Sequence, residues 1–401
     1  MKMLMLLSRC PYPLEKGDKL RAYHQLKEWS KKYEIHLFFV TWTNPSSTQI
    51  EALSFYCKSI TFVKLNCISF FCSLWKFVLK KQALQCAFFY SRRAQKQFDI
   101  LQNQLQPELV FCQLVRMTPY TKTVSSLKIL DYQDAFSSGL YRRLQVAPWY
   151  LRWPLRYEYR AMKAMENQVF SQFDIKTIIS AQDRDLISHP HKNEIKILPN
   201  GVDTTYFDPA IATQTEKELA YMGTFDIVFT GNMSYPPNED AAVFLVKKIY
   251  PLLKVSHPNL RILIAGATPS LKVKALAASH ICVSGWMDDI RMAYLAARIF
   301  VAPMRLGSGM QNKLLEAMSM QLACLITPLV SKGLNEKGKE PEVFEVCEAT
   351  AEAFADKITC LLKDSELQLQ MGQQARSYVM NTFSWEAQSS KLSQWIIDLQ
   401  H

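Results

Sequence analysis

The sequence predicts an α/β protein built from two doubly wound parallel sheets. The chain has 401 residues, which is enough for two domains of about 200 residues that each bury a core. Short apolar runs alternate with helical patterns along the whole chain, as they do in βαβ units. A turn-rich segment, residues 198–203 (LPNGVD), divides these runs into two series. We therefore expect one sheet on each side of this segment.

The first series of strands starts at the N-terminus. Residues 1–7 are apolar but few, and no small-residue cleavage site follows them, so we expect a buried strand and not a signal peptide. A helix is expected over residues 20–32. The expected strands of this series are residues 4–7, 35–40, 60–63, 109–112, 128–130 and 177–180.

The second series repeats the same rhythm after the turn-rich segment. Its expected strands are residues 226–230, 261–266, 281–284, 300–303 and 323–327. Open parallel sheets bind ligands at the carboxyl ends of their strands. The two domains are therefore expected to face each other across a central cleft.

The composition excludes several classes of protein. Apolar residues make up 49% of the chain and charged residues 21%, which is typical of a soluble globular protein. No apolar run reaches the ~18 residues that a membrane-spanning helix needs. The ten cysteines form no CxxC pair, so we expect reduced core residues in a cytoplasmic protein. The seven histidines show no metal-ligand spacing, and no metal is expected.

The charge is distributed unevenly along the chain. Residues 1–200 carry 29 Lys and Arg against 15 Asp and Glu, a net charge of +14. Residues 201–401 carry 18 against 21, a net charge of −3. The asymmetry indicates an anionic partner for the first half: nucleic acid, a membrane surface or a phosphorylated substrate.

The stretch at residues 304–318 predicts an anion-binding loop. It follows an expected strand, and Gly307 and Gly309 let the chain turn before a helical apolar pattern begins. Free backbone N–H groups and the helix dipole would then point into the loop. An ordinary βα turn with a glycine-rich loop is the alternative explanation.

Polar side chains around this loop suit a nucleotide. Arg305 and Lys313 flank it with positive charge. Asn312 and Glu316 are four residues apart and share one helix face, where a carboxylate can accept hydrogen bonds from sugar hydroxyls. The set fits a diphosphate with a ribose nearby.

Two further stretches have open interpretations. The loop at residues 11–21 joins the first strand to the first helix. It could bind a ligand, because Gly17 allows close backbone approach and several cations lie beside it, but it is also consistent with a solvated basic loop.

Residues 141–163 interleave Arg and Lys with Trp and Tyr, which suits an anionic membrane surface or single-stranded nucleic acid. A helix that packs its aromatic residues inward is the third option. A second aromatic and basic stretch, residues 70–81, favours the membrane.

Taken in order, these motifs resemble the GT-B glycosyltransferases of the family-4 type. More closely, they are similar to the bacterial sugar transferases associated with exopolysaccharide and PEP-CTERM export systems. The resemblance runs nearly from end to end. It rests on residues 9–13 (RCPYP), 16–21 (KGDKLR), 198–203 (LPNGVD), 229–238 (FTGNMSYPPN), 285–289 (GWMDD), 309–318 (GMQNKLLEAM) and 383–386 (FSWE).

The resemblance implies a fold and an activity. We expect two Rossmann-like domains, residues 1–200 on the acceptor side and 201–380 on the nucleotide-sugar side, with a final helix in residues 381–401 that crosses back to the first domain. The expected reaction moves a sugar from a nucleoside-diphosphate donor to a hydroxyl of a lipid-linked glycan, with retention and without cofactor or metal. The basic first half would dock on the inner face of the cytoplasmic membrane, and nucleic acid is not an expected partner.

The resemblance also implies site residues. Glu316 would bind the ribose hydroxyls, Lys313 the diphosphate or sugar, and Gly17 would close over the donor. The expected donor-binding residues are Gly231, Asn232, Gly285, Trp286, Gly307, Gly309, Met310, Asn312, Leu314 and Glu316. The expected catalytic residues are Gly17, Asp18, Asp134, Arg305, Lys313 and Glu316. Asp131 and Asp134 are candidates for positioning the acceptor hydroxyl.

The chain departs from the family pattern at several positions. Ser308 stands where a second glutamate is common, and Asn232 and Asn238 lie in the region of a usual Arg/Lys pair. Gln321 lies in a turn that usually contains glycine. A non-catalytic nucleotide-sugar binder and a sugar-nucleotide epimerase of the same architecture therefore remain alternatives. A nucleic-acid-binding protein would need a signature that the sequence lacks.

Overall fold

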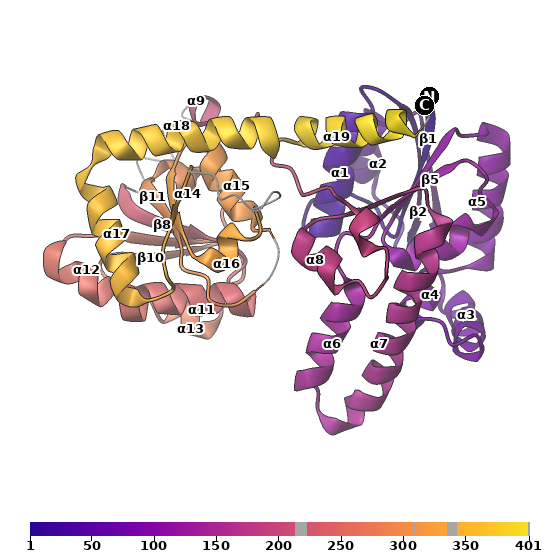
Figure 1. The fold of residues 1–401 in the computed structure, drawn as a ribbon, viewed down its shortest axis with the longest axis horizontal. Coiled ribbons are helices and arrows are strands. Elements are labelled where there is room, and N and C mark those ends of the chain that lie inside the picture. Colours follow the sequence, from indigo (N-terminus) through magenta and orange to yellow (C-terminus); the bar gives the residue numbers. More distant parts are fainter. Residues whose placement is uncertain (213–222, 308–309, 335–342, 400–401) are drawn as a thin grey trace. The chain divides into compact units, whose positions relative to one another are not determined.

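The computed structural model describes residues 1–212, 223–307, 310–334 and 343–399, and it divides into two compact units (Figure 1). The first unit is Met1–Pro199 together with Ser389–His401, and the second is Asn200–Gln388. The last helix, α19 (Trp385–Asp398), thus begins in the second unit and ends in the first.

The first unit contains a seven-stranded sheet in the order β3-β2-β1-β4-β5-β6-β7. All its strand pairs are parallel. The strands are β1 (Lys2–Leu7), β2 (Glu34–Thr41), β3 (Ser59–Lys64), β4 (Leu109–Gln113), β5 (Leu127–Asp131), β6 (Ile175–Ile178) and β7 (Lys196–Ile197).

Strand β1 lies between β2 and β4 in the middle of this sheet. Leu4 and Leu6 pack into the core on one face, and Met3 and Met5 into the core on the other. A strand that is buried on both faces needs a continuous apolar run instead of an alternating one. This explains the sequence of the N-terminus.

Helices cover both faces of the first sheet (Figure 1). They are α1 (Gly17–Trp29), α2 (Ser47–Ser54), α3 (Cys67–Leu79), α4 (Leu84–Phe89), α5 (Arg92–Leu105), η1 (Val115–Thr123), α6 (Phe136–Val146), α7 (Trp149–Val169), η2 (Phe170–Gln172), α8 (Ala181–Leu186) and η3 (Lys192–Glu194).

The second unit contains a six-stranded parallel sheet in the order β10-β9-β8-β11-β12-β13. Its strands are β8 (Phe225–Thr230), β9 (Ile262–Ala265), β10 (Ile281–Gly285), β11 (Ala297–Ala302), β12 (Ala323–Ile326) and β13 (Glu345–Val346). Its helices are α9 (Pro209–Ala212), α11 (Pro236–Phe244), η5 (Leu245–Ile249), α12 (Tyr250–Ser256), α13 (Leu271–Lys274), α14 (Arg291–Leu295), α15 (Asn312–Ser319), α16 (Pro328–Ser331), α17 (Ala351–Lys363) and α18 (Ser365–Thr382).

The expected pair of doubly wound parallel sheets is confirmed. Several bounds differ from the sequence-based expectation by up to three residues, and α1, for example, begins at Gly17 and not at residue 20. Two further details also differ. The aromatic and basic stretch at residues 141–163 belongs to two helices, because α6 ends at Val146 and α7 begins at Trp149, after Ala147 and Pro148. The two-residue strands β7 and β13 were not expected, since so short a run has no detectable period.

The strand order places one topological switch point in each sheet, where ligands bind in open α/β folds. In the first sheet it lies between β1 and β4, and in the second between β8 and β11. None of the described helices is long and apolar enough to cross a membrane.

The cysteines whose pairing is described are free. Cys10, Cys86, Cys112, Cys324 and Cys347 are buried, as expected. Cys67, Cys282 and Cys360 are exposed, so the expectation of core residues is wrong for these three.

Candidate active site

Two glycine turns meet at the switch point of the second sheet. Gly231 follows β8 with φ +149° and Gly266 follows β9 with φ +135°, both in the region that favours glycine. A Cβ atom on Gly266 would lie 1.9 Å from the carbonyl oxygen of Gly231. A Cβ atom on Gly231 would lie 3.2 Å from Lys313 Nζ. The two turns therefore pack backbone against backbone, directly beside the lysine.

Lys313 brings a buried cation to this place. It is in the first turn of α15 and only 8% exposed. Its Nζ donates a hydrogen bond to Asn238 Oδ1 and lies 4.6 Å above the centre of the Phe229 ring. Burial lowers the pKa of Lys313 to about 7, and the carboxylate of Glu316 opposes this effect. An anion bound beside Nζ would restore the charge.

Glu316 lies one helical turn after Asn312 and is held by a buried tyrosine. Tyr294 Oη donates to Glu316 Oε2 at 2.8 Å, and Thr230 Oγ1 lies 2.9 Å from the same hydroxyl. Burial raises the pKa of Glu316, whereas the bond from Tyr294 and the charge of Lys313 lower it. Among the described residues, only Oε2 of Glu316 has a hydrogen-bond partner. Oε1 is left to accept a bond from a ligand hydroxyl.

Asn232 and Asn238 stand where the family pattern commonly has cations, and both organise the first glycine turn. Asn232 Oδ1 accepts bonds from the Ser234 backbone N–H at 3.0 Å and from Thr268 Oγ1 at 2.7 Å. Asn238 Nδ2 donates to the carbonyl oxygen of Asn232 at 2.8 Å. Asn238 therefore connects this turn to Lys313, which supplies the positive charge.

The other flanking cation, Arg305, already has a partner. Its Nε and one terminal nitrogen lie 3.1 and 2.6 Å from the two carboxylate oxygens of Asp240, and its guanidinium lies 4.3 Å above the Phe244 ring. A ligand phosphate would have to share this charge with Asp240. Gly307 continues the turn with φ +111°. Gly309, with Ser308, lies outside the described residues.

The remaining expected residues of α15 have different surroundings. Asn312 Oδ1 accepts a bond from Asn200 Nδ2 at 3.4 Å. Leu314 is fully buried in the core, so only its backbone could meet a ligand. Met310 is partly buried and packs against the same core.

The turn after β10 presents an exposed indole. Gly285 has φ +72°, and its carbonyl accepts a bond from the Gly266 backbone N–H at 3.0 Å. Trp286 is 73% exposed, and its Nε1 donates to Asp288 Oδ1 at 3.2 Å. This turn thus adjoins the glycine pair and offers a ring on which a base could stack.

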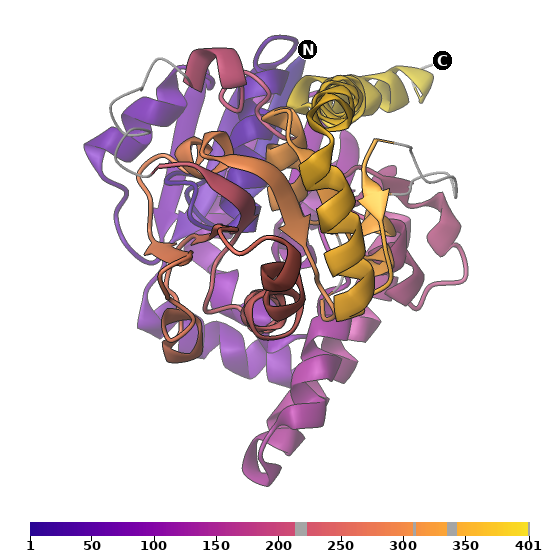
Figure 2. The same ribbon diagram turned by 90° about the vertical axis from the view of Figure 1, so that its left-hand side faces the viewer.

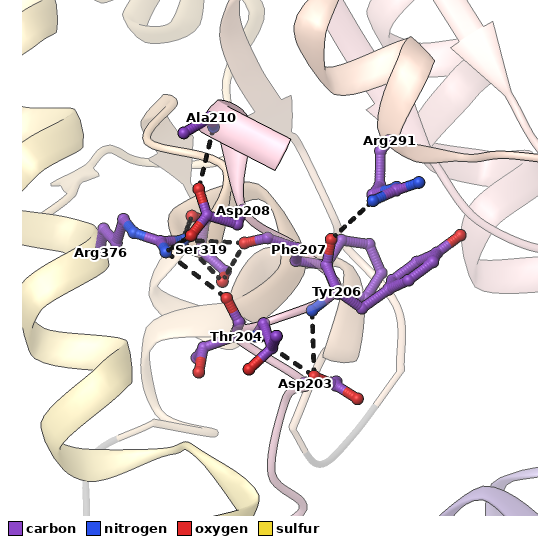
Figure 3. Close-up of polar contacts among 10 residues, drawn as sticks. Asp203, Thr204, Tyr206, Phe207, Asp208, Ala210, Arg291, Ser319 and Arg376 are labelled. Carbon is purple, nitrogen blue, oxygen red and sulfur yellow. Dashed lines mark hydrogen bonds and ion pairs between the residues drawn. The ribbon is translucent and has the colours of Figure 1, made fainter. Parts of the chain in front are cut away.

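A network of polar contacts fixes the segment after the domain boundary (Figure 3). Arg376 of α18 lies 2.7 Å from Asp208 and donates to the Phe207 carbonyl at 2.8 Å, which also accepts from Ser319 Oγ of α15. Arg291 packs 4.2 Å above the Tyr206 ring. The segment is therefore attached to the helix that carries Lys313 and Glu316.

In the first unit, charged residues gather at the switch point between β1 and β4. Gly17 is the first residue of α1, and no atom lies within 4 Å of a Cβ added there. Asp18 Oδ2 lies 3.1 Å from Arg9 Nε and 3.4 Å from Arg116 Nη2. Burial lowers the pKa of Arg116 to about 10.

Asp134 follows β5 and belongs to the same region. The residue as a whole is exposed, but the surrounding protein desolvates its carboxyl group. This desolvation and the charge of Asp183 raise the pKa of Asp134 to about 6, while Arg116 and Arg142 oppose the shift. A carboxyl poised near neutrality suits proton transfer at an acceptor hydroxyl.

The expectation that Asp131 positions the acceptor is wrong. Asp131 is fully buried, and its carboxylate binds Arg21 Nε at 2.6 Å and Thr177 Oγ1 at 3.0 Å. Arg21 also donates to the carbonyl oxygens of Leu198 and Pro199. The pair is structural, because a buried carboxylate needs a compensating cation.

Three site residues escaped sequence reasoning. Gly266 directly follows the apolar strand β9, and this position is a sequence signal that could have identified Gly266 as part of a second close turn. Tyr294 lies in a short helix, α14, whose sequence contains no motif, and Asn238 is recognisable in the sequence only as a departure from the family pattern. Within the described part of the chain, no group of three or more His, Cys, Asp or Glu residues is arranged to hold a metal ion.

Part of the chain matches a known family model, and a curated protein is similar over most of the chain. Residues 224–364 match the family model described as "Glycosyl transferases group 1". A Klebsiella pneumoniae protein named "Uncharacterized 44.6 kDa protein in cps region" is 21% identical over 351 residues, which are 83% of this chain and 84% of the relative.

Solved structures match nearly the whole chain. A glycosyltransferase from Rickettsia africae ESF-5 gives a TM-score of 0.67 at 15% identity, over 98% of this chain and 97% of that one. Anabaena Alr3699/HepE in complex with UDP gives a TM-score of 0.67 at 11% identity, over 99% and 100% of the two chains. The fold is therefore that of the GT-B glycosyltransferases. The part of the chain that matches the group 1 family model, residues 224–364, lies within the second unit.

Proposed function

We propose that the chain transfers a sugar from a nucleoside-diphosphate donor to a hydroxyl of a lipid-linked glycan, with retention at the anomeric carbon. The observation that carries the proposal is the pair of Lys313 and Glu316 on one helix start, beside the two glycine turns. The solved Alr3699/HepE structures, in complex with UDP and with UDP-glucose, support a nucleotide-sugar donor.

The residues have separate tasks in this proposal. Glu316 Oε1 accepts bonds from the ribose hydroxyls, while Tyr294 fixes the other carboxylate oxygen. Lys313 meets the diphosphate across the Gly231 turn, where a side chain would block its approach. When the bond from the sugar to the diphosphate breaks, negative charge develops on the leaving phosphate, and a positioned cation stabilises it. The acceptor oxygen bonds to the anomeric carbon and gives its proton to the carboxylate of Asp134.

The first unit supplies the acceptor side. Asp18 and Asp134 at its switch point are the proposed polar groups for the acceptor hydroxyl. A lipid-linked acceptor would place the protein on the inner face of the cytoplasmic membrane, and the net charge of +14 on residues 1–200 favours an anionic surface. The relative named for a cps region supports a role in cell-surface polysaccharide synthesis.

The test is a release assay for nucleoside diphosphate with a panel of nucleotide sugars, with and without membrane extract as acceptor. Release from one donor that depends on acceptor, and that falls at least about 100-fold in Glu316→Gln, is expected. Glu352→Gln, an exposed glutamate in the first turn of α17, is the matched control.

Other outcomes identify other functions. Donor binding without release would indicate a non-catalytic binder. Interconversion of the donor sugar without acceptor would indicate an epimerase. Absence of binding to every nucleotide sugar would contradict the proposal.

A further inference from the structure

Helices α6 and α7 form a hairpin that projects from the first unit (Figure 1, Figure 2). The two helices pack against each other, and Pro148 precedes the first residue of α7. The tip is formed by large side chains that are exposed to solvent. They are Val146, Trp149, Tyr150, Leu151 and Trp153, with Trp149 82% and Trp153 79% exposed.

An exposed group of this kind needs an explanation. Single exposed apolar residues are common, but a contiguous cluster with two tryptophans indicates an interaction surface. Because this cluster lies at the end of a hairpin, it could contact a partner while the sheet and the candidate active site keep their structure.

The sides of the hairpin carry positive charge only. Six cations lie on the two helices: Arg142, Arg143, Arg152, Arg156, Arg160 and Lys163. Its two carboxylates are buried and face the protein. Glu158 accepts bonds from the backbone N–H groups of Leu84 and Gln85, and Glu166 accepts one from Ser137. The solvent-facing surface of the hairpin therefore has no carboxylate to balance its cations.

Arg152 lies at the tip, and Arg156 and Arg160 follow one and two helical turns further along α7. Arg152, Arg156 and Arg160 recur every four residues, so they share one face of α7. Together with Tyr141 and Tyr159 they line one hollow between the two helices. At 1.5 Å per residue, Arg160 lies about 10 Å along the axis from Trp153, which is about the depth that interfacial segments reach into a bilayer.

We infer that the tip of the α6–α7 hairpin inserts into an anionic lipid bilayer, with Trp149 and Trp153 at the acyl boundary and the arginines among the phosphate groups. The inference specifies the membrane contact of the proposed function and rests on it, although donor binding does not require it. Helix α3 supplies a second contact of the same chemistry, since Phe71, Trp75 and Leu79 are exposed near Lys76 and Lys80.

The layering favours a membrane over nucleic acid. Here Val146 and Leu151 share the tip, and aliphatic side chains offer neither stacking nor hydrogen bonds. Apolar side chains at the tip, with Arg156 and Arg160 further along α7, match the order of a bilayer surface, in which the phosphate groups lie outside the acyl chains.

The test is co-sedimentation with vesicles of phosphatidylglycerol and phosphatidylethanolamine, compared with phosphatidylcholine alone. The variant Trp149→Glu/Trp153→Glu is expected to lower the partition coefficient on anionic vesicles at least about tenfold. The control is Phe55→Glu, which changes a 78% exposed aromatic residue at the end of α2 and should partition like wild type. Equal partition of both variants and wild type would overturn the inference.

A second variant tests the charged layer. Arg156→Gln/Arg160→Gln should weaken binding to anionic vesicles about fivefold per arginine, whereas Lys254→Gln in the second unit should not. Binding of wild type to a single-stranded oligonucleotide in place of vesicles would also overturn the inference.

Two measurements on the same preparations separate the possible failures. The thermal midpoint shows that each variant is folded. The affinity for UDP-glucose should be unchanged in all of them. If wild type binds vesicles but no nucleotide sugar, the proposed function fails while the hairpin contact stands.

Discussion

Lys313 carries its charge inside the protein, between the Phe229 ring and the Asn238 amide. Because the pKa of Lys313 is about 7 in the protein without donor, its ammonium group loses its proton as the pH rises above neutrality. A bound diphosphate raises this pKa, because a neighbouring anion favours the charged form. Donor binding above pH 7 must therefore take up a proton, and it becomes weaker as the pH rises.

The measurement is the Kd for UDP-glucose between pH 7 and 9, where the diphosphate of the donor does not titrate. In wild type we expect the Kd to rise by up to about tenfold per pH unit. Lys313→Gln should bind weakly and without this slope. A pH-independent Kd in wild type would mean that Lys313 does not meet the diphosphate.

Gln321 is a residue whose backbone conformation suits glycine. It has φ +59°, in the turn between α15 and β12 where the family pattern has glycine. A left-handed residue other than glycine costs roughly 1 kcal/mol. We expect Gln321→Gly to stabilise the protein by about 0.5–1 kcal/mol and to leave transfer unchanged.

Urea unfolding tests this expectation. The control, Gln370→Gly, lies at an exposed position within α18 and should destabilise the protein by about 1 kcal/mol. If both variants destabilise equally, the left-handed turn has no cost.

At the scale of elements, the close approach of the turns after β8 and β9 shapes the candidate donor site. Gly266→Ala places a methyl group 1.9 Å from the Gly231 carbonyl, so the turns must separate and move Gly231 relative to Lys313. We expect at least about a tenfold loss of UDP-glucose affinity. Gly139→Ala in α6, where no atom lies within 4 Å of the new Cβ, is the control. Unchanged affinity in Gly266→Ala would show that the turns do not position the donor.

The regular elements follow from the sequence because each strand is an apolar run of detectable length. Two strands show this clearly, because their apolar runs predict strands and the side chains are fully buried: Ile227, Val228 and Phe229 in β8, and Leu263 and Ile264 in β9. Gly231 and Gly285 were predicted for the same reason, since each follows such a run, whereas Gly266 was missed although it also follows one.

Partners of side chains were not predictable. Nothing in the sequence pairs Arg305 with Asp240, or Asp131 with Arg21, because these contacts join residues 65 and 110 positions apart. The same holds for Tyr294, which comes from a different helix than Glu316. Long-range pairing depends on how the sheets bring loops together, and a local pattern carries no information about it.

At the scale of the whole molecule, the two units are proposed to divide the reaction. In this proposal the second unit binds the donor, and Asp134 of the first unit accepts the proton of the acceptor hydroxyl. Because the pKa of Asp134 is raised to about 6, its carboxylate form grows as the pH rises through 6. We expect the transfer rate of wild type to increase over pH 5–7. In Asp134→Asn we expect the rate to lose this pH dependence, while the Kd for the donor stays at the wild-type value.

A pH profile of single-turnover transfer, with donor affinity measured in parallel, tests the division. The control is Asp185→Asn, an exposed carboxylate in α8. An Asp134→Asn profile that matches wild type would remove Asp134 from the acceptor step.

The most direct test of the central claim follows the sugar itself. Purified protein is given a nucleotide sugar labelled in the sugar, together with lipid extract, and label in the lipid fraction is measured for wild type, Glu316→Gln and Glu352→Gln. We predict transfer by wild type and Glu352→Gln, and loss of at least about 100-fold in Glu316→Gln. Equal transfer by wild type and Glu316→Gln would contradict the assignment of the site to sugar transfer.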